Sequence, residues 1–163
     1  MRIIVCGAGQ VGTSIARQLT LENNDVTVVD HSPERIERIS DSLDVKAVVG
    51  FASYPTVLKD IGAEFADMII AVTLSDEVNM VACQVAHSLF NVPTKIARIR
   101  NKNYLQPEWK QLYRHDHLPI DFIISPEIEV AKAVIHRLHV PGAVETIPLA
   151  DGKIKVVGLR CTL

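Results

Sequence analysis

A glycine-rich turn near the start of the chain restricts its possible folds more than any other feature. The residues are Gly7-Ala8-Gly9-Gln10-Val11-Gly12, a complete GxGxxG pattern that directly follows the apolar run at residues 3–6. The first glycine permits a tight turn, the second lets the backbone approach a pyrophosphate, and the third lets a helix pack closely on the preceding strand. Amide groups at the start of that helix then point at the phosphates. The sequence therefore predicts a strand–turn–helix unit that binds a dinucleotide or another adenine nucleotide.

An acidic residue, Asp30, supplies the second half of this pattern. It follows the apolar run at residues 26–29 and lies close to the expected distance of about 20 residues beyond the glycines. A carboxylate there accepts hydrogen bonds from the adenosine ribose and repels a 2′-phosphate, so it favours NAD over NADP. Taken alone, Asp30 could equally be a turn residue at a strand end. Arg35 could accommodate a phosphate, but it fits an exposed helix face better.

The rest of the chain predicts an α/β fold, because short apolar runs alternate with amphipathic stretches of helical length. The predicted strands are residues 3–6, 26–29, 46–49, 68–72, 95–99 and 122–124, and the predicted helices are residues 10–22, 33–43, 54–61, 76–90, 103–113 and 126–139. Most of the apolar runs are continuous, as expected for strands covered on both faces. We therefore expect a Rossmann-type, doubly wound parallel sheet with helices on both faces.

The pattern changes after Pro141-Gly142. Two β-rich stretches, at residues 144–149 and 154–163, flank the turn signal Asp151-Gly152 and predict a short C-terminal β-hairpin. An isolated hairpin is marginally stable in water, so this one needs a partner. We expect residues 1–140 to form the nucleotide-binding domain. We expect residues 141–163 to be a linker and the start of a C-terminal subdomain, in a chain that is the front part of a longer protein.

Two further strand ends carry polar residues that suit a ligand site. Thr73 and Leu74 follow the predicted strand at residues 68–72, and Arg98 and Arg100 lie at the end of the strand at residues 95–99. In open α/β sheets, ligands bind beyond the carboxyl ends of the strands. Thr73 could equally cap the next helix, because Thr73-x-x-Asp76 is a capping-box pattern. The two arginines could be surface charges or could contact phosphates.

Charge, hydropathy and cysteine content exclude several classes of protein. The formal net charge is −2, so there is no general basic field to bind nucleic acid. The longest apolar run, at residues 68–72, is much shorter than the roughly 20 residues of a membrane span, and strand-like residues begin too early to leave room for a signal peptide. The three cysteines, at positions 6, 83 and 161, form no CxxC pair. This spacing fits a reducing cytosol and argues against a disulfide framework or a cysteine-based zinc site.

Nothing in the sequence pairs a nucleophile with a base. The histidines of Arg114-His115-Asp116-His117 fit an exposed loop better than a metal site. A dehydrogenase needs a substrate domain or a proton-transfer group over the nicotinamide, and only about 23 residues follow the predicted nucleotide fold. A nucleotide sensor that is not an enzyme fits this length better than a complete oxidoreductase.

Several sequence blocks resemble one family of regulatory domains. The blocks are MRIIVCGAGQVG at residues 1–12 and the stretches at residues 23–30, 62–68, 71–83, 96–100 and 119–121. Over essentially its whole length, the chain resembles the nucleotide-binding regulatory (KTN or RCK) domains of bacterial potassium transporters, of the TrkA type. The resemblance implies a Rossmann-type domain that binds NAD(H) or ATP/ADP and regulates without catalysing a reaction.

The same resemblance implies a location and partners. Such domains form a homodimer or a larger ring in the cytoplasm and sit peripherally at the cytoplasmic face of the inner membrane, through a membrane potassium transporter subunit and without inserting themselves. Two positions depart from the family. Many relatives have arginine at Gln10, where it reaches a phosphate, and others have Asp or Asn at Phe51, where it contacts adenine. Phe51 could stack on the base or pack into the core.

The leading hypothesis is therefore a cytosolic regulatory subunit of a potassium uptake transporter, with NAD(H), or ATP or ADP at the same site, as its ligand. The alternative is a fragment of an NAD-dependent oxidoreductase that lacks its catalytic domain. A third reading is a nucleotide-binding domain of a potassium efflux system, which uses the same fold.

Overall fold

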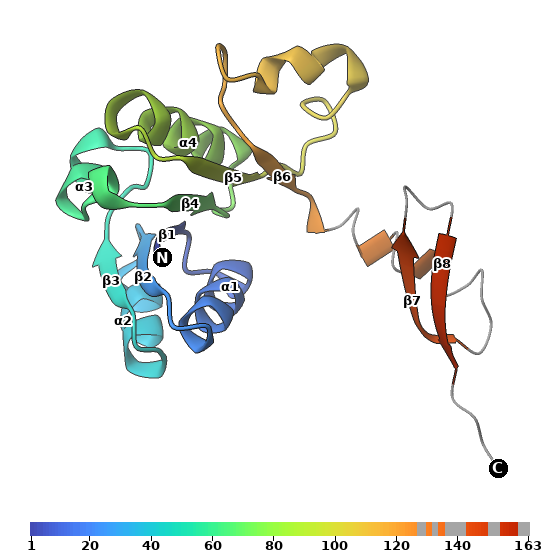
Figure 1. Cartoon of the computed structure of the whole chain (residues 1–163). Helices are drawn as coiled ribbons and strands as arrows, with labels where there is room; N and C mark the ends of the chain where they lie inside the picture. The colour runs from blue at the N-terminus through green and yellow to red at the C-terminus, as the bar shows by residue number, and fades with distance from the viewer. Residues whose placement is uncertain (127–129, 132–133, 136–142, 150–153, 160–163) are drawn as a thin grey trace. The chain divides into compact units, whose positions relative to one another are not determined.

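Six parallel strands form the central sheet of the computed structural model (Figure 1). The strands are β1 (Arg2–Cys6), β2 (Asp25–Asp30), β3 (Lys46–Val49), β4 (Met68–Ala71), β5 (Thr94–Arg98) and β6 (Phe122–Ile124). Their order is β3-β2-β1-β4-β5-β6, and every neighbouring pair is parallel. The chain therefore starts in the middle of the sheet and winds outward in both directions. This confirms the predicted Rossmann-type doubly wound fold.

Helices cover both faces of the sheet (Figure 1). On one face, α1 (Gln10–Leu21) and α2 (Pro33–Ser42) pack on side chains such as Ile3 and Val5. On the other face, α3 (Pro55–Asp60), the 3₁₀ helix η1 (Ala63–Phe65) and α4 (Asp76–Phe90) pack on side chains such as Ile4 and Cys6. Because successive strand residues point to opposite faces, a continuous apolar run supplies both cores at once.

The structure describes residues 1–126, 130–131, 134–135, 143–149 and 154–159. It divides into two compact units, Met1–Ile124 and Ser125–Leu163. In the second unit, β7 (Ala143–Leu149) pairs antiparallel with β8 (Ile154–Leu159), which confirms the predicted hairpin. The predicted turn at Asp151-Gly152 and parts of the predicted helix at residues 126–139 lie outside the described residues. The predicted domain boundary near residue 140 stays a prediction.

Two local details differ from the sequence-based expectations. The predicted helix at residues 103–113 is helical only over Pro107–Tyr113, the 3₁₀ helix η2, in which no residue is buried. Because no residue of η2 is fully buried, packing contributes little to stabilise an α-helix there. Thr73 does not cap α4, because the N-cap residue is Ser75, whose hydroxyl accepts a hydrogen bond from the amide of Val78 at 3.3 Å.

The two cysteines of the first unit are core residues, as the sequence predicted. Cys6 lies in β1 and Cys83 in α4, and both are fully buried. Burial raises the pKa of both thiols above the ordinary value, that of Cys83 to about 12. Both therefore act as small apolar side chains rather than as reactive thiolates.

The close packing of α1 on β1 predicts that adding one methyl group at Gly12 strongly destabilises the fold. A Cβ at Gly12 would lie 1.8 Å from the carbonyl oxygen of Gly7 and could be accommodated only by moving backbone. We expect Gly12→Ala to lower the free energy of unfolding by about 3 kcal/mol or more. Gly9→Ala is the matched control, because a Cβ there has nothing within 4 Å, and it should cost less than about 1 kcal/mol through a weaker N-cap. Urea denaturation of both variants measures the difference, and equal losses would contradict this packing account.

Candidate functional site

The candidate site lies where the sheet changes winding direction, beyond the carboxyl ends of β1 and β4. Gly7, which follows β1, has φ of +109°, and a Cβ there would lie 3.0 Å from the amide nitrogen of Thr73, which follows β4. The amide of Gly7 donates to the carbonyl of Val29 in β2 at 2.7 Å. The glycine turn is therefore held between the ends of β2 and β4, the two strands that flank β1. In doubly wound sheets this switch point is where ligands bind.

A cavity of about 260 Å³ opens at this switch point. It collects eight of the residues predicted from the sequence, namely Gly7, Gly9, Gln10, Val11, Asp30, Thr73, Leu74 and Arg98. A second cavity, of about 160 Å³, shares Asp30, Thr73 and Leu74 with the first and adds Phe51. The predicted residues Ala8, Gly12 and Arg100 line neither of the two cavities. Ala8 and Gly12 are buried in the turn and in α1.

Asp30 joins the two cavities and also holds the glycine turn. Its carboxylate is buried, and it accepts a hydrogen bond from the amide of Ala8 at 2.8 Å and another from the amide of Ser32 at 2.9 Å. The imidazole of His31 and the guanidinium of Arg35 lie 3.4 and 3.6 Å from it. Each carboxylate oxygen has two lone pairs, so Asp30 can still accept from a ligand hydroxyl. Asp30 therefore does more than end a strand, because it anchors the glycine turn and lines both cavities.

The start of α1 leaves room for an anionic group. Gly9 is the N-cap residue and makes no side-chain cap, and the space where its Cβ would stand is empty to 4 Å. Amides in the first turn of a helix have no partners within the helix, and the helix dipole favours negative charge there. Gln10 is exposed at this end of the cavity and brings no charge of its own. The open backbone at Gly9 thus fits the pyrophosphate of a dinucleotide.

Phe51 does not pack into the core, so one of its two predicted roles is wrong. Half of its surface is exposed, and its ring stacks on His31 with 5.4 Å between centroids and 14° between planes. Tyr54 is a second neighbour of this ring, with 5.1 Å between centroids and a tilt of 31° between the planes. Stacked aromatic rings beside a cavity offer a flat apolar surface. The position suits a heteroaromatic base.

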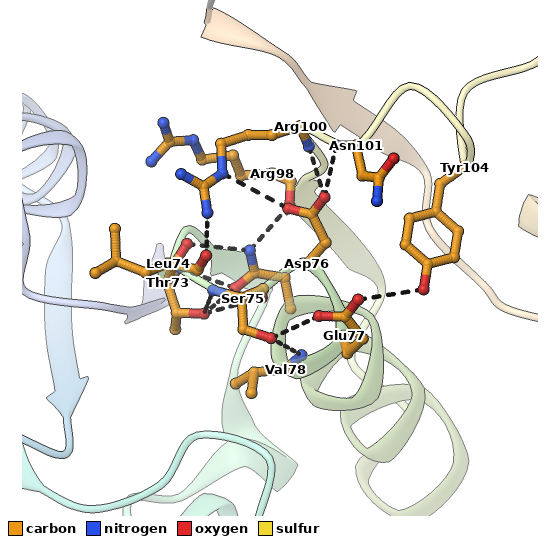
Figure 2. A network of polar contacts seen from close by, with 11 residues as sticks. Thr73, Leu74, Ser75, Asp76, Glu77, Val78, Arg98, Arg100, Asn101 and Tyr104 are labelled. Atoms are coloured by element: carbon orange, nitrogen blue, oxygen red, sulfur yellow. Dashed lines mark hydrogen bonds and ion pairs between the residues drawn. The ribbon is translucent and has the colours of Figure 1, made fainter.

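The two arginines of the β5 end lie in different places (Figure 2). Arg98 lines the larger cavity. Arg100 instead donates from its guanidinium to the carbonyl of Leu74, and its Nε lies 3.8 Å from the carboxylate of Asp76. Arg98 thus lines the cavity, and the guanidinium of Arg100 lies in the polar network around Asp76.

Sequence reasoning missed two residues that shape this site, His31 and Asn79. His31 lies beside Asp30 just before α2, and Asn79 connects the ends of β4 and β5 from within α4. Arg35, for which an exposed helix face was favoured over a phosphate contact, approaches Asp30 from α2 and lines the larger cavity. A signal for Asn79 was present in the sequence, since a short amide residue in an otherwise apolar helix stretch needs a buried partner.

Two other features of the first unit do not belong to this site. A cavity of about 610 Å³ lies along η2 and is lined by Tyr104, Trp109 and Leu112 among others, but none of the strand ends reaches it. Residues 114–117 are exposed, as predicted. Within the described ranges there is no cluster of three or more potential metal ligands, and no helix there is long and apolar enough to span a membrane.

The sheet order, with the glycine turn at its switch point, places this chain in the class of Rossmann-type domains. Within that class, the family model of the TrkA-N domain matches residues 3–126. The chain belongs to the TrkA-N domain family, as the sequence blocks predicted.

Relatives of high identity carry one name. The Trk system potassium uptake protein TrkA of Azorhizobium caulinodans is 59% identical over 161 residues, which is 99% of this chain and 35% of that protein. The protein of the same name from Halomonas elongata is 47% identical over 160 residues, 98% of this chain and 35% of that protein. The chain thus spans about a third of the length of these curated relatives.

Solved structures share the fold at lower identity. The TrkA-N domain of the inner membrane protein ybaL from Escherichia coli matches with a TM-score of 0.72 and 18% identity, over 84% of this chain and 96% of that one. The GsuK channel bound to NAD matches with a TM-score of 0.68 and 19% identity, over 92% of this chain and 25% of that one. At these identities the likeness establishes the fold.

The geometry of Asp30 predicts a role in stability that is separate from any ligand. Asp30→Ala leaves the amides of Ala8 and Ser32 without their acceptors, so we expect a loss of about 2 kcal/mol or more in the free energy of unfolding. Asp25→Ala removes the same charge at the exposed start of the same strand and should cost less than about 0.5 kcal/mol. Denaturant unfolding without nucleotide provides both values, and a loss no larger for Asp30→Ala than for Asp25→Ala would refute the role of Asp30.

Proposed function

We propose that this chain is the nucleotide-binding part of a cytosolic regulatory subunit, which controls a membrane potassium uptake transporter in response to NAD(H) or to ATP and ADP. The observation that carries the proposal is the cavity at the switch point, on which the open backbone of Gly9 and the carboxylate of Asp30 both lie. Membership of the TrkA-N family and the names of the high-identity relatives support the potassium-uptake role.

The bound nucleotide would follow the two connected cavities. Its phosphates would lie over Gly9 and the first turn of α1, beside Arg98. The adenosine ribose would donate to Asp30, where the two cavities meet, and the adenine would rest against Phe51 in the smaller one. GsuK, which shares this fold, has been seen with NAD and with ADP, so both ligand types are compatible with the architecture.

A regulator fits the site better than an enzyme. The residues on the larger cavity offer hydrogen bonds and positive charge to a nucleotide, but they include no cysteine, serine or lysine nucleophile. The relatives are named for potassium uptake, and none of those compared supports the oxidoreductase alternative. We propose that the nucleotide is bound and released unchanged.

Assembly and location follow from the same proposal. The residues Val130 and Val134 in the second unit are more than half exposed. We propose that this unit takes part in a homodimer or larger ring, because a small hairpin is marginally stable alone and exposed apolar side chains favour association. The assembled protein would lie in the cytoplasm and reach the inner membrane through its transporter subunit, without inserting itself.

One shared site predicts competition between NADH and ATP. Both ligands carry adenosine, so Asp30→Ala should weaken both by about ten-fold or more and leave their affinity ratio nearly unchanged. Arg98 reaches the phosphates or the distal half of NAD, where the two ligands differ, so Arg98→Ala should change the ratio. Arg114→Ala removes an exposed arginine far along the chain and should change neither affinity. Calorimetric titration of each ligand alone and in the presence of the other tests this.

Two outcomes of that titration would contradict the single-site proposal. One is simultaneous binding of NADH and ATP to one protomer. The other is an Asp30→Ala variant that folds and binds both ligands with unaltered affinity.

Dependence on a protein partner predicts how the protein distributes in cells. With no spanning helix in the described part of the chain, attachment should come from the transporter subunit. Cell fractionation should therefore find the full-length protein in the membrane fraction when that subunit is present and in the soluble fraction when it is deleted. Equal membrane association in both strains would overturn this part of the proposal.

A further inference from the structure

Two polar side chains in the first turn of α4 are buried next to residues that line the larger cavity. Asp76 is 6% exposed and Asn79 is fully buried. They are three residues apart, so they lie on the same face of the helix. Both side chains bind backbone that leaves β5, which places the polar network of Figure 2 between the ends of β4 and β5.

Asn79 fixes the two strand ends that line the cavity. Its Nδ2 donates to the carbonyl of Arg98 at 2.9 Å, and its Oδ1 accepts from the amide of Thr73 at 2.9 Å. The Thr73 hydroxyl lies 2.7 Å from the same oxygen. One buried amide group therefore sets the spacing between Thr73 and Arg98 on the cavity wall.

Asp76 fixes the chain directly after Arg98. A single oxygen, Oδ2, accepts from the amide of Arg100 at 2.9 Å and from the amide of Asn101 at 2.7 Å. The other oxygen, Oδ1, is buried, has no hydrogen-bond partner among the described residues, and faces the guanidinium of Arg100 with 3.8 Å to its Nε. Oδ2 thus accepts hydrogen bonds from two backbone amides, whereas Oδ1 is stabilised by the nearby positive charge of Arg100.

We propose that Asp76 is a positioning residue for the nucleotide site, which holds Arg98 in the orientation that meets the phosphates. This rests on the proposed function. The backbone of Arg98 is anchored at its own carbonyl by Asn79 and two residues further on by Asp76. An arginine that is already oriented loses less conformational freedom on binding, so it contributes more to affinity.

The contact between Asp76 and Arg100 also explains how an acidic residue can lie so close to a site for phosphates. A free carboxylate behind the cavity wall would repel phosphate, but Arg100 lies against Asp76 and offsets its charge. Arg100 contacts Asp76 and Leu74, whereas Arg98 lines the larger cavity. The two arginines at this strand end have separate tasks.

The test compares three variants with two ligands, ADP and adenosine, by calorimetric titration. Asp76→Ala should weaken ADP binding by about ten-fold and leave adenosine binding within about two-fold, because adenosine has no phosphate for Arg98 to meet. Asp76→Asn should keep ADP binding within about three-fold, since the amide oxygen can accept from both backbone amides. Glu77→Gln is the control, because it removes the charge of an adjacent, exposed acid that contacts Ser75 and Tyr104 instead.

Each outcome decides the matter. An equal loss in Asp76→Asn and Asp76→Ala would show that charge, and not the held backbone, is responsible, and would overturn the inference. So would equal weakening of ADP and adenosine by Asp76→Ala, which indicates general disorder of the site. If the wild-type chain binds both ligands and Asp76→Ala binds ADP with the wild-type affinity, this inference alone is overturned. If the wild-type chain binds neither ligand, the proposed function is overturned as well.

Hydrogen exchange in the unmodified protein tests the same claim if Asp76→Ala does not fold. The amides of Arg100 and Asn101 should exchange slowly in the free protein, and ADP should slow them further while adenosine does not. Unchanged exchange at these two amides on addition of ADP would contradict a link between Asp76 and the phosphate end of the cavity.

Discussion

The close approach of helix α1 to the end of β1 is the constraint on which the site depends. It is possible because Gly12 has no side chain at the point where a Cβ would meet the carbonyl of Gly7. With the helix so close, the turn between them must be short, and its open backbone at Gly9 stands at the switch point of the sheet. The carboxylate of Asp30 then fixes that turn from the neighbouring strand by its bond to Ala8. The close packing of α1 on β1 therefore also determines the shape of the turn at the ligand site.

The far side of the cavity is built by a different kind of interaction. On the glycine side, close backbone packing sets the geometry, whereas on the β4–β5 side two buried polar side chains of α4 set it through hydrogen bonds. Buried hydrogen bonds are costly to leave unmade, so such a network favours one arrangement strongly. A nucleotide between these two walls would contact a rigid turn on one side and a held arginine on the other.

Much of this site could be predicted because a parallel sheet brings strand ends together. Gly7, Asp30, Thr73 and Arg98 are far apart in the sequence, but each lies at the end of a strand or within two residues after it, and all four line one cavity. Contacts that depend on how a helix is rotated could not be predicted in this way. Arg35 reaches Asp30 and Asn79 reaches Arg98 only because α2 and α4 pack in particular orientations. The same holds for η2, since nothing buried in it decides between helix types.

The central claim is that one nucleotide site lies at the switch point of the sheet. A crystal structure of the chain with NADH tests it most directly. The account predicts the pyrophosphate over Gly9, the adenosine ribose within hydrogen-bonding distance of Asp30 and the adenine against Phe51. Density for the nucleotide in another place, such as the cavity beside Trp109, with the switch point left empty, would contradict it.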